Sequence, residues 1–214
     1  MDITLRDATP DDADFIAWVQ VEASRSGTPL GFWDVALPGP DAPRIATVAR
    51  VVAAPRESFV HVSGFVVAEQ GGQPVAAMSA YDPGKKKLGH FISALNSTLA
   101  LEGWSEAHLG LLGHRLSPVV ACLSDAQPGM WVIEWVAAKP EARGKGVAQC
   151  LLDLLLERGR SLGYHRAQIS YLLGNNPAQR CYERAGFRVV DDKRHPDFEA
   201  IFGAPGTARM LCEL

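Results

Sequence analysis

The pattern of apolar and polar residues is most regular between residues 144 and 162. Apolar side chains recur there four positions apart, as in Val147, Leu151 and Leu155. This spacing places them on one face of a helix, and Gly163 suits the cap at its end. The segment therefore predicts an amphipathic helix with one face against a core.

Short β-branched and aromatic runs along the chain predict strands. The strands expected are residues 3–6, 60–69, 74–81, 130–137, 165–172, 187–190 and 209–213, with further helices after residue 9, at 45–53, within 88–129 and at 176–184. The segments 27–43 and 193–206 are rich in proline and glycine, so the first predicts a loop or broken helix and the second a loop.

The order of these elements predicts an α/β fold. A helical crossover joins strands 131–137 and 165–172, which should therefore lie parallel, whereas the earlier strands follow one another as hairpins. We expect one domain over residues 1–214 with a central mixed, mostly antiparallel twisted sheet and helices on both faces. A helical insertion at 88–129 precedes the strand 130–137.

Composition narrows the class of protein. The 214 residues are 47% hydrophobic and 21% charged, as in soluble globular proteins, and the net charge of -3 gives no basic footprint for nucleic acid. The acidic amino terminus does not resemble a signal peptide, and no apolar run approaches the roughly 20 residues that span a bilayer. We expect a cytoplasmic protein without nucleic-acid or membrane partners.

The cysteines and histidines predict no metal site. Cys122, Cys150, Cys181 and Cys212 show neither zinc-ligand spacing nor a redox pair, and the six histidines are scattered. We interpret the cysteines as reduced, mostly buried thiols.

The run from Arg143 to Ala148 carries the first functional signal. It stands between a predicted strand and a predicted helix, where backbone N–H groups are unpaired and the helix dipole is positive. Glycine at 144 and 146 lets a phosphate approach these N–H groups, although glycines also serve tight packing. The order of residues does not fit a nucleotide P-loop, and Gln149 replaces the third glycine of a dinucleotide fingerprint.

Two motifs resemble the GNAT superfamily, the general amine N-acetyltransferases. The first resembles Arg/Gln-x-x-Gly-x-Gly/Ala and is matched by Arg143, Gly146 and Ala148. The second resembles Asn-x-x-Ala-x-x-x-Tyr-x-x-x-Gly-Phe and is matched by Asn175, Ala178, Tyr182, Gly186 and Phe187. The two occur in the expected order within residues 130–191, which would form the cofactor-binding core of a GNAT-type fold.

The resemblance implies acetyl-CoA as the cosubstrate and no metal. The loop residues Arg143, Gly144, Lys145, Gly146, Val147 and Ala148 would hold the coenzyme A pyrophosphate, and the strand residues Trp135, Val136 and Ala137 would lie beside the pantetheine arm. A β-bulge in that strand would open space for the arm. Asn175 would hydrogen-bond the pantetheine, but it would serve equally as a helix cap, and Arg143 would otherwise cap or pair with Glu141.

Two residues are the catalytic candidates. By resemblance, Tyr182 would donate its phenolic proton to the departing thiolate; alternatively, it packs on the sheet. Strand alternation places Glu134 with Val132 and Val136, where it would accept a proton from the amine or instead form a salt bridge. Cys150 and Cys181 lack activating neighbours, so burial is favoured over a nucleophilic role.

These features predict an enzyme that moves an acetyl group from acetyl-CoA directly to a primary amine. The acceptor is a small molecule or a protein, and a homodimer is possible. An acyl-CoA-binding or sensing module of the same fold is the alternative. The acceptor pocket is expected from 27–43, 88–129 and 193–206, where Trp33, Trp104 and Phe198 either line it or belong to the core or a dimer contact.

Overall fold

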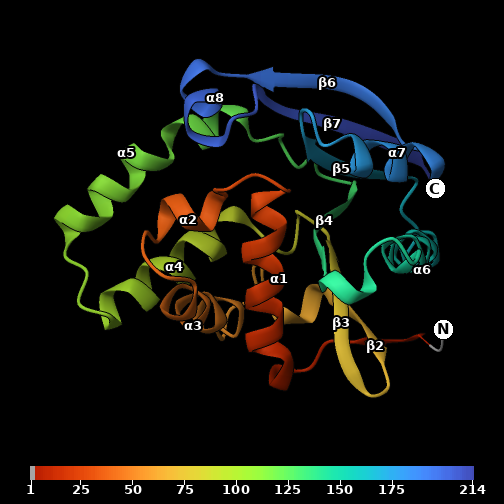
Figure 1. Cartoon of the computed structure of the whole chain (residues 1–214), viewed down its shortest axis with the longest axis horizontal. Helices are drawn as coiled ribbons and strands as arrows, with labels where there is room; N and C mark the ends of the chain where they lie inside the picture. The colour runs from red at the N-terminus through yellow and green to blue at the C-terminus, as the bar shows by residue number, and fades with distance from the viewer. Residues whose placement is uncertain (1–2) are drawn as a thin grey trace.

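A computed structural model describes residues 3–214, and its centre is a seven-stranded sheet (Figure 1). The strands follow the order β1-β2-β3-β4-β5-β7-β6. They are β1 (Ile3–Asp7), β2 (Phe65–Gln70), β3 (Gln73–Tyr81), β4 (Trp131–Ala138), β5 (Arg166–Leu172), β6 (Arg188–Arg194) and β7 (Gly206–Glu213). Among these described strands only β4 and β5 pair in parallel; the other neighbours are antiparallel, as the hairpin and crossover pattern predicts.

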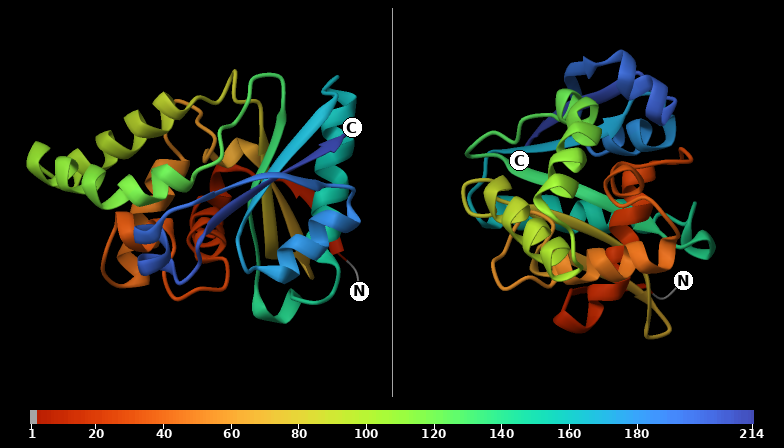
Figure 2. Two further views of the ribbon diagram at one scale, coloured as in Figure 1. Left: turned by 90° about the horizontal axis from the view of Figure 1, so that it is seen from above. Right: turned by 90° about the vertical axis from the view of Figure 1, so that its left-hand side faces the viewer.

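Within residues 3–214, eight α-helices cover the two faces of the sheet (Figure 2). They are α1 (Ala13–Arg25), α2 (Phe32–Ala36), α3 (Asp41–Val52), α4 (Leu88–Leu101), α5 (Glu106–Cys122), α6 (Val147–Ser161), α7 (Asn176–Arg184) and α8 (Pro196–Phe202), with 3-10 turns at Pro10–Asp12, Val62–Gly64 and Pro140–Ala142. The prediction of a mixed, mostly antiparallel sheet with helices on both faces is confirmed.

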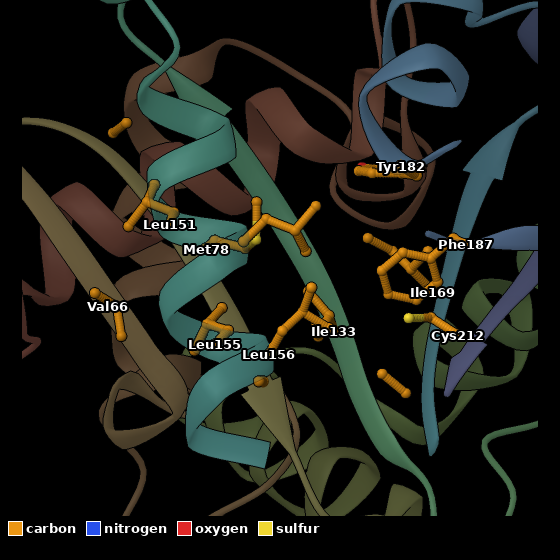
Figure 3. Close-up of a cluster of buried hydrophobic side chains, with 14 of the residues drawn as sticks. Val66, Met78, Ile133, Leu151, Leu155, Leu156, Ile169, Tyr182, Phe187 and Cys212 are labelled. Carbon is orange, nitrogen blue, oxygen red and sulfur yellow. The ribbon is translucent and has the colours of Figure 1, made fainter. Parts of the chain in front are cut away.

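Helix α6 packs its leucines on one face of the sheet. Leu151, Leu155 and Leu156 lie against Val66 and Ile133 (Figure 3). Each of these leucines is at most 4% exposed, so each contributes about 2 kcal/mol through burial. The helix begins at Val147, three residues later than expected, because the preceding glycines adopt left-handed conformations that a helix does not continue.

Helices α1, α2, α3 and α4 cover the opposite face. Ile16 and Val19 of α1 and Val48 of α3 are fully buried there against strands β2 and β3. Trp33 is fully buried in the same cluster and Phe198 is 4% exposed in a smaller one, so both belong to the core. Trp104 is partly buried and packs against the same cluster as Trp33.

The segment 88–129 forms two helices, as its two separate apolar groups predict. In Figure 1, α5 runs from the end of α4 to α8, beside the carboxyl-terminal strands. Val119 and Cys122 of α5 pack against Phe198 and Phe202 of α8, while Leu112 belongs to the cluster under α4. Helix α5 thus packs against α8 near one end and against the cluster that contains α4 near the other.

Two local expectations were wrong. The segment 193–206 is not all loop, because Pro196 begins helix α8, whose N-terminal N–H groups are capped by the His195 side chain at Asp197. Cys150 is exposed rather than buried, because it lies on the solvent side of α6, whereas Cys122 and Cys212 are buried. All four cysteines are free.

Candidate active site

A β-bulge in β4 determines where the site residues point. Ser79 of β3 faces Glu134, but Ala77 faces Ala137, so β4 carries one residue more than β3 over this stretch. Trp135 absorbs the irregularity with a left-handed φ of 52°, which is uncommon for a bulky side chain. Because of the bulge, consecutive residues Glu134 and Trp135 lie on the same face of the sheet.

This bulge corrects the expected alternation along β4. Glu134 was expected on one face with Val136, but Val136 packs against the α6 core while Trp135 packs in the cluster below α1 and α3. Glu134 follows Ile133, which also faces α6, so the carboxylate points to the face of α1–α4.

Strands β4 and β5 separate directly before the bulge. Their parallel pairing covers three residue pairs and ends at Ile133 and Ile169. Beyond it, the Lys139 N–H donates to Val75 of β3, so by alternation the Val136 N–H faces the side from which β5 has diverged. The β4 backbone there is available to a ligand lying between the two strands.

Glu134 is half-buried and has a perturbed pKa. Desolvation raises the pKa of its carboxyl to about 7, against the lowering influence of the Tyr81 hydroxyl and the Trp135 indole N–H, which face it. Burial and the same carboxylate raise the pKa of Tyr81 far above its usual range. A carboxyl with this pKa exchanges a proton near neutral pH, as a general base requires.

The loop before α6 has the geometry of an anion-binding turn. Gly144 and Gly146 have φ of 70° and 80°, and neither has an atom within 4 Å of the position that a Cβ would occupy. The first helical hydrogen bond runs from Cys150 N to Gly146 O, which leaves the N–H groups of the preceding residues free of helix partners. Exposed backbone N–H groups at the positive end of a fifteen-residue helix suit a diphosphate.

The Arg143 side chain turns away from this loop. Its Nε donates to Ala138 O at 2.8 Å, and its Nη2 lies 3.7 Å from Glu22 Oε2 on α1. Its ion-pair partner is therefore Glu22 and not the neighbouring Glu141. Arg143 joins the end of β4 to α1, while Lys145 and Gly146 remain exposed.

Tyr182 lies on the other face of the sheet from Glu134. It is 5% exposed and belongs to the core under α6, where its ring meets Phe187 edge-on with centroids 6.4 Å apart. Figure 3 shows it beyond Ile169 at one end of this cluster. Burial raises the pKa of its hydroxyl above the ordinary value of 10, so the phenol stays protonated at neutral pH.

Asn175 caps α7 and also holds the end of α1. Its Oδ1 accepts the Ala178 N–H at 3.1 Å, and its Nδ2 donates to Ser26 Oγ at 2.8 Å and Ser26 O at 3.2 Å. The cap expected from the sequence is present, and the side-chain amide is already engaged. Its contact with a pantetheine arm stays a prediction.

The structure thus places the expected residues around the separation of β4 and β5. Trp135, Val136 and Ala137 follow its start, Gly144 to Ala148 come just beyond the end of β4, and Asn175 and Tyr182 follow β5. Tyr81, Ser26 and Glu22 were not anticipated. No motif marks them, because each acquires its role from a partner distant in the sequence.

Comparison with known proteins decides the family. Residues 52–187, more than half of the chain, match the family model described as Acetyltransferase (GNAT) family. The chain belongs to this GNAT acetyltransferase family. No curated protein sequence matches it.

Solved structures share the GNAT fold with this family member. A structure described as an acetyltransferase is 19% identical, with 98% of each chain covered and a TM-score of 0.69. The polyamine N-acetyltransferase of Drosophila melanogaster, an enzyme that forms N-acetylagmatine, is 16% identical over all of both chains, with a TM-score of 0.55. N-acetylglutamate synthase from Neisseria gonorrhoeae, in complex with coenzyme A and N-acetylglutamate, is 14% identical over all of this chain and 35% of its own, with a TM-score of 0.52.

Two structural features are absent from residues 3–214 of this GNAT protein. No group of three or more His, Cys, Asp and Glu side chains in that part of the chain is arranged to hold a metal ion. None of its described helices is both long and apolar enough to cross a membrane.

Proposed function

We propose that this protein transfers an acetyl group from acetyl-CoA directly to a primary amine of a small molecule or protein. The observation that carries the proposal is the opening between β4 and β5, with Glu134 on one side of the sheet and Tyr182 on the other. A thioester lying between the strands is reached from both sides. The family model and the coenzyme A complex of a protein with this fold support acetyl-CoA as donor.

The residues present fit the cosubstrate. The unpaired N–H groups of Gly144, Lys145 and Gly146, with the first turn of α6, would bind the pyrophosphate, and the left-handed glycines leave room for it. The β4 backbone at Val136 would align the pantetheine arm and polarise the thioester carbonyl. Bound acetyl-CoA supplies the acetyl group as an activated thioester.

Glu134 would prepare the amine for attack. An amine arrives as an ammonium ion and has no free electron pair until it loses a proton. The Glu134 carboxylate, whose pKa of about 7 lies close to neutral pH, would accept that proton. The neutral nitrogen then forms a bond to the acetyl carbon.

Tyr182 would complete the transfer. As the carbon–sulfur bond breaks, the electron pair moves to sulfur, and the phenolic proton passes to it to give the free thiol of coenzyme A. The acetylated nitrogen then releases its second proton, which reprotonates Tyr182 through solvent, and Glu134 gives the proton that it accepted to solvent, so both residues return to their starting states. Neither Cys150 nor Cys181 is required, because no covalent acyl-enzyme is formed.

The test is release of coenzyme A thiol from acetyl-CoA with a panel of primary amines. Amine-dependent release together with a mass increase of the amine by one acetyl group is the expected result. Binding of acetyl-CoA by calorimetry with no turnover on any amine would favour the acyl-CoA-sensing module instead. Absence of both binding and turnover would contradict the coenzyme A site itself.

A further inference from the structure

Glu134 differs from the other inward-facing carboxylates in lacking a cationic partner. Asp12 pairs with Arg6 at 2.7 Å, Glu69 also pairs with Arg6 at 2.7 Å, and Asp34 pairs with Arg25 at 2.8 Å. Within residues 3–214 no ion pair includes Glu134, and no charged group acts on its pKa. The position beside this carboxylate is therefore open to one positive charge from outside the chain.

Aromatic side chains surround the carboxylate on its face of the sheet. Trp135 shares this face because of the bulge, and Tyr81 of β3 lies on it two residues beyond Ser79, the strand partner of Glu134. The ring of Phe59 lies 5.7 Å from Tyr81, the ring of Phe91 lies 5.0 Å from Phe59, and Phe32 follows at 6.2 Å from Phe91. An unbroken row of rings thus leads from Glu134 to helix α2.

Part of this aromatic row remains accessible. Phe91 and Tyr81 are 7% and 5% exposed and serve the core. Phe59, Phe32 and Trp135 are only partly buried, although each packs against that core. Partly exposed rings beside an unpartnered carboxylate offer contact for an ammonium group and for an apolar body attached to it.

We propose that the acceptor is a monoamine whose single ammonium group is attached to an aromatic or similarly apolar body. This rests on the proposed N-acetyltransferase function. A second ammonium group, as in a polyamine, would find no unpaired carboxylate along the aromatic row, because Glu57, Asp82 and Asp34 already pair with Lys86, Lys85 and Arg25. The carboxylate of an amino acid lies next to its ammonium group, so it would find no cation beside Glu134 and would be repelled by it.

Two matched pairs of amines test, on the unmodified protein, whether a second charged group on the acceptor lowers turnover. Phenylalanine adds a carboxylate to 2-phenylethylamine, and 1,6-diaminohexane adds an ammonium group to hexylamine. We expect kcat/KM for each monoamine to exceed that of its doubly functional partner by at least about tenfold, because an unpaired charge must be desolvated. Equal or better turnover of 1,6-diaminohexane or phenylalanine would overturn the inference, whereas no turnover of any amine would overturn the proposed function.

Truncation of the aromatic row tests its location. We expect Phe59→Ala to raise KM for 2-phenylethylamine about tenfold while kcat changes little, since a lost apolar contact weakens binding of substrate and transition state alike. Phe15→Ala is the matched control, because Phe15 is a partly buried phenylalanine of α1 that stacks on Trp18. An unchanged KM in folded Phe59→Ala, or an equal rise in Phe15→Ala, would contradict this placement.

Discussion

Asn175 and Ser26 are joined by two hydrogen bonds although 149 positions separate them in the sequence. Ser26 ends α1 in a left-handed conformation with φ of 54°, and Asn175 begins α7. The contact ties the helix that covers one face of the sheet to the helix that carries Tyr182. It also occupies the amide that the family resemblance assigns to the cosubstrate.

Two substitutions of Ser26 distinguish the stability contributed by its hydrogen bond from the cost of its left-handed backbone conformation. Ser26→Ala loses the Oγ acceptor and should lower the free energy of unfolding by about 1 kcal/mol. Ser26→Gly loses the same bond but adopts the left-handed conformation without steric cost, so its stability should stay within about 0.5 kcal/mol of the wild type. Urea denaturation measures both, and an alanine variant at least as stable as the glycine variant would contradict this account.

Removal of the Tyr182 hydroxyl should affect the chemical step alone. Tyr182→Phe keeps the ring in the core against Phe187, so folding should be retained. We expect kcat to fall by about 10²-fold, as for loss of a general acid, while the Kd for acetyl-CoA changes less than about threefold. Steady-state kinetics and calorimetry provide the two numbers, and parallel losses in both would count against the proton-donor role.

The rate should follow the ionisation of Glu134. A base acts only when deprotonated, so kcat/KM should rise tenfold per pH unit below the carboxyl pKa of about 7 and level off above it. Glu134→Gln should remove most of the activity and this acid limb. A pH profile from 5 to 9 measures the effect, and an unchanged acid limb in Glu134→Gln would assign it to another group.

The same carboxyl should make stability depend on pH. Its pKa in the folded protein, about 7, exceeds the ordinary value of 4.5, so the fold favours the neutral form. The stability that this group contributes is complete below pH 4.5 and is lost as pH rises through 7. Glu134→Gln should therefore match the wild type at pH 4.5 and exceed its unfolding free energy by on the order of 2 kcal/mol at pH 8.5. Denaturation curves at the two pH values would show the opposite trend if the carboxyl were stabilised in its charged form.

One glycine on each side of α6 allows two alanine variants to be compared. Gly146 and Gly163 have φ of 80° and 82°, and an added Cβ would meet no atom of the chain within 4 Å at either. Alanine at either position should cost about 1 kcal/mol of stability. Coenzyme A affinity, measured by calorimetry, should fall at least tenfold in Gly146→Ala alone, because the methyl group would point into the phosphate site. Equal affinities in the two variants would place the pyrophosphate elsewhere.

The sequence was sufficient where the determining interactions are local. The amphipathic spacing of Val147, Leu151 and Leu155 predicts α6 and its buried face, and the parallel crossover follows from element order. Helix α7 occupies the expected residues, because Asn175 and Gly186 mark its two ends within a few positions. The matches at Arg143–Ala148 and Asn175–Phe187 identified the family for the same reason.

Tertiary structure decided which side chains meet at the site. Glu134 and Trp135 share a face only because the bulge against β3 adds a residue to β4, and Tyr81 reaches the carboxylate from a strand 53 positions earlier. Such contacts depend on register and packing between segments far apart in the chain, which local spacing does not record. The sequence by itself determined the glycine loop, where we propose that coenzyme A binds, and the family, because glycine conformations and helix caps are local. The partnerless carboxylate and its aromatic row exist only in the folded chain.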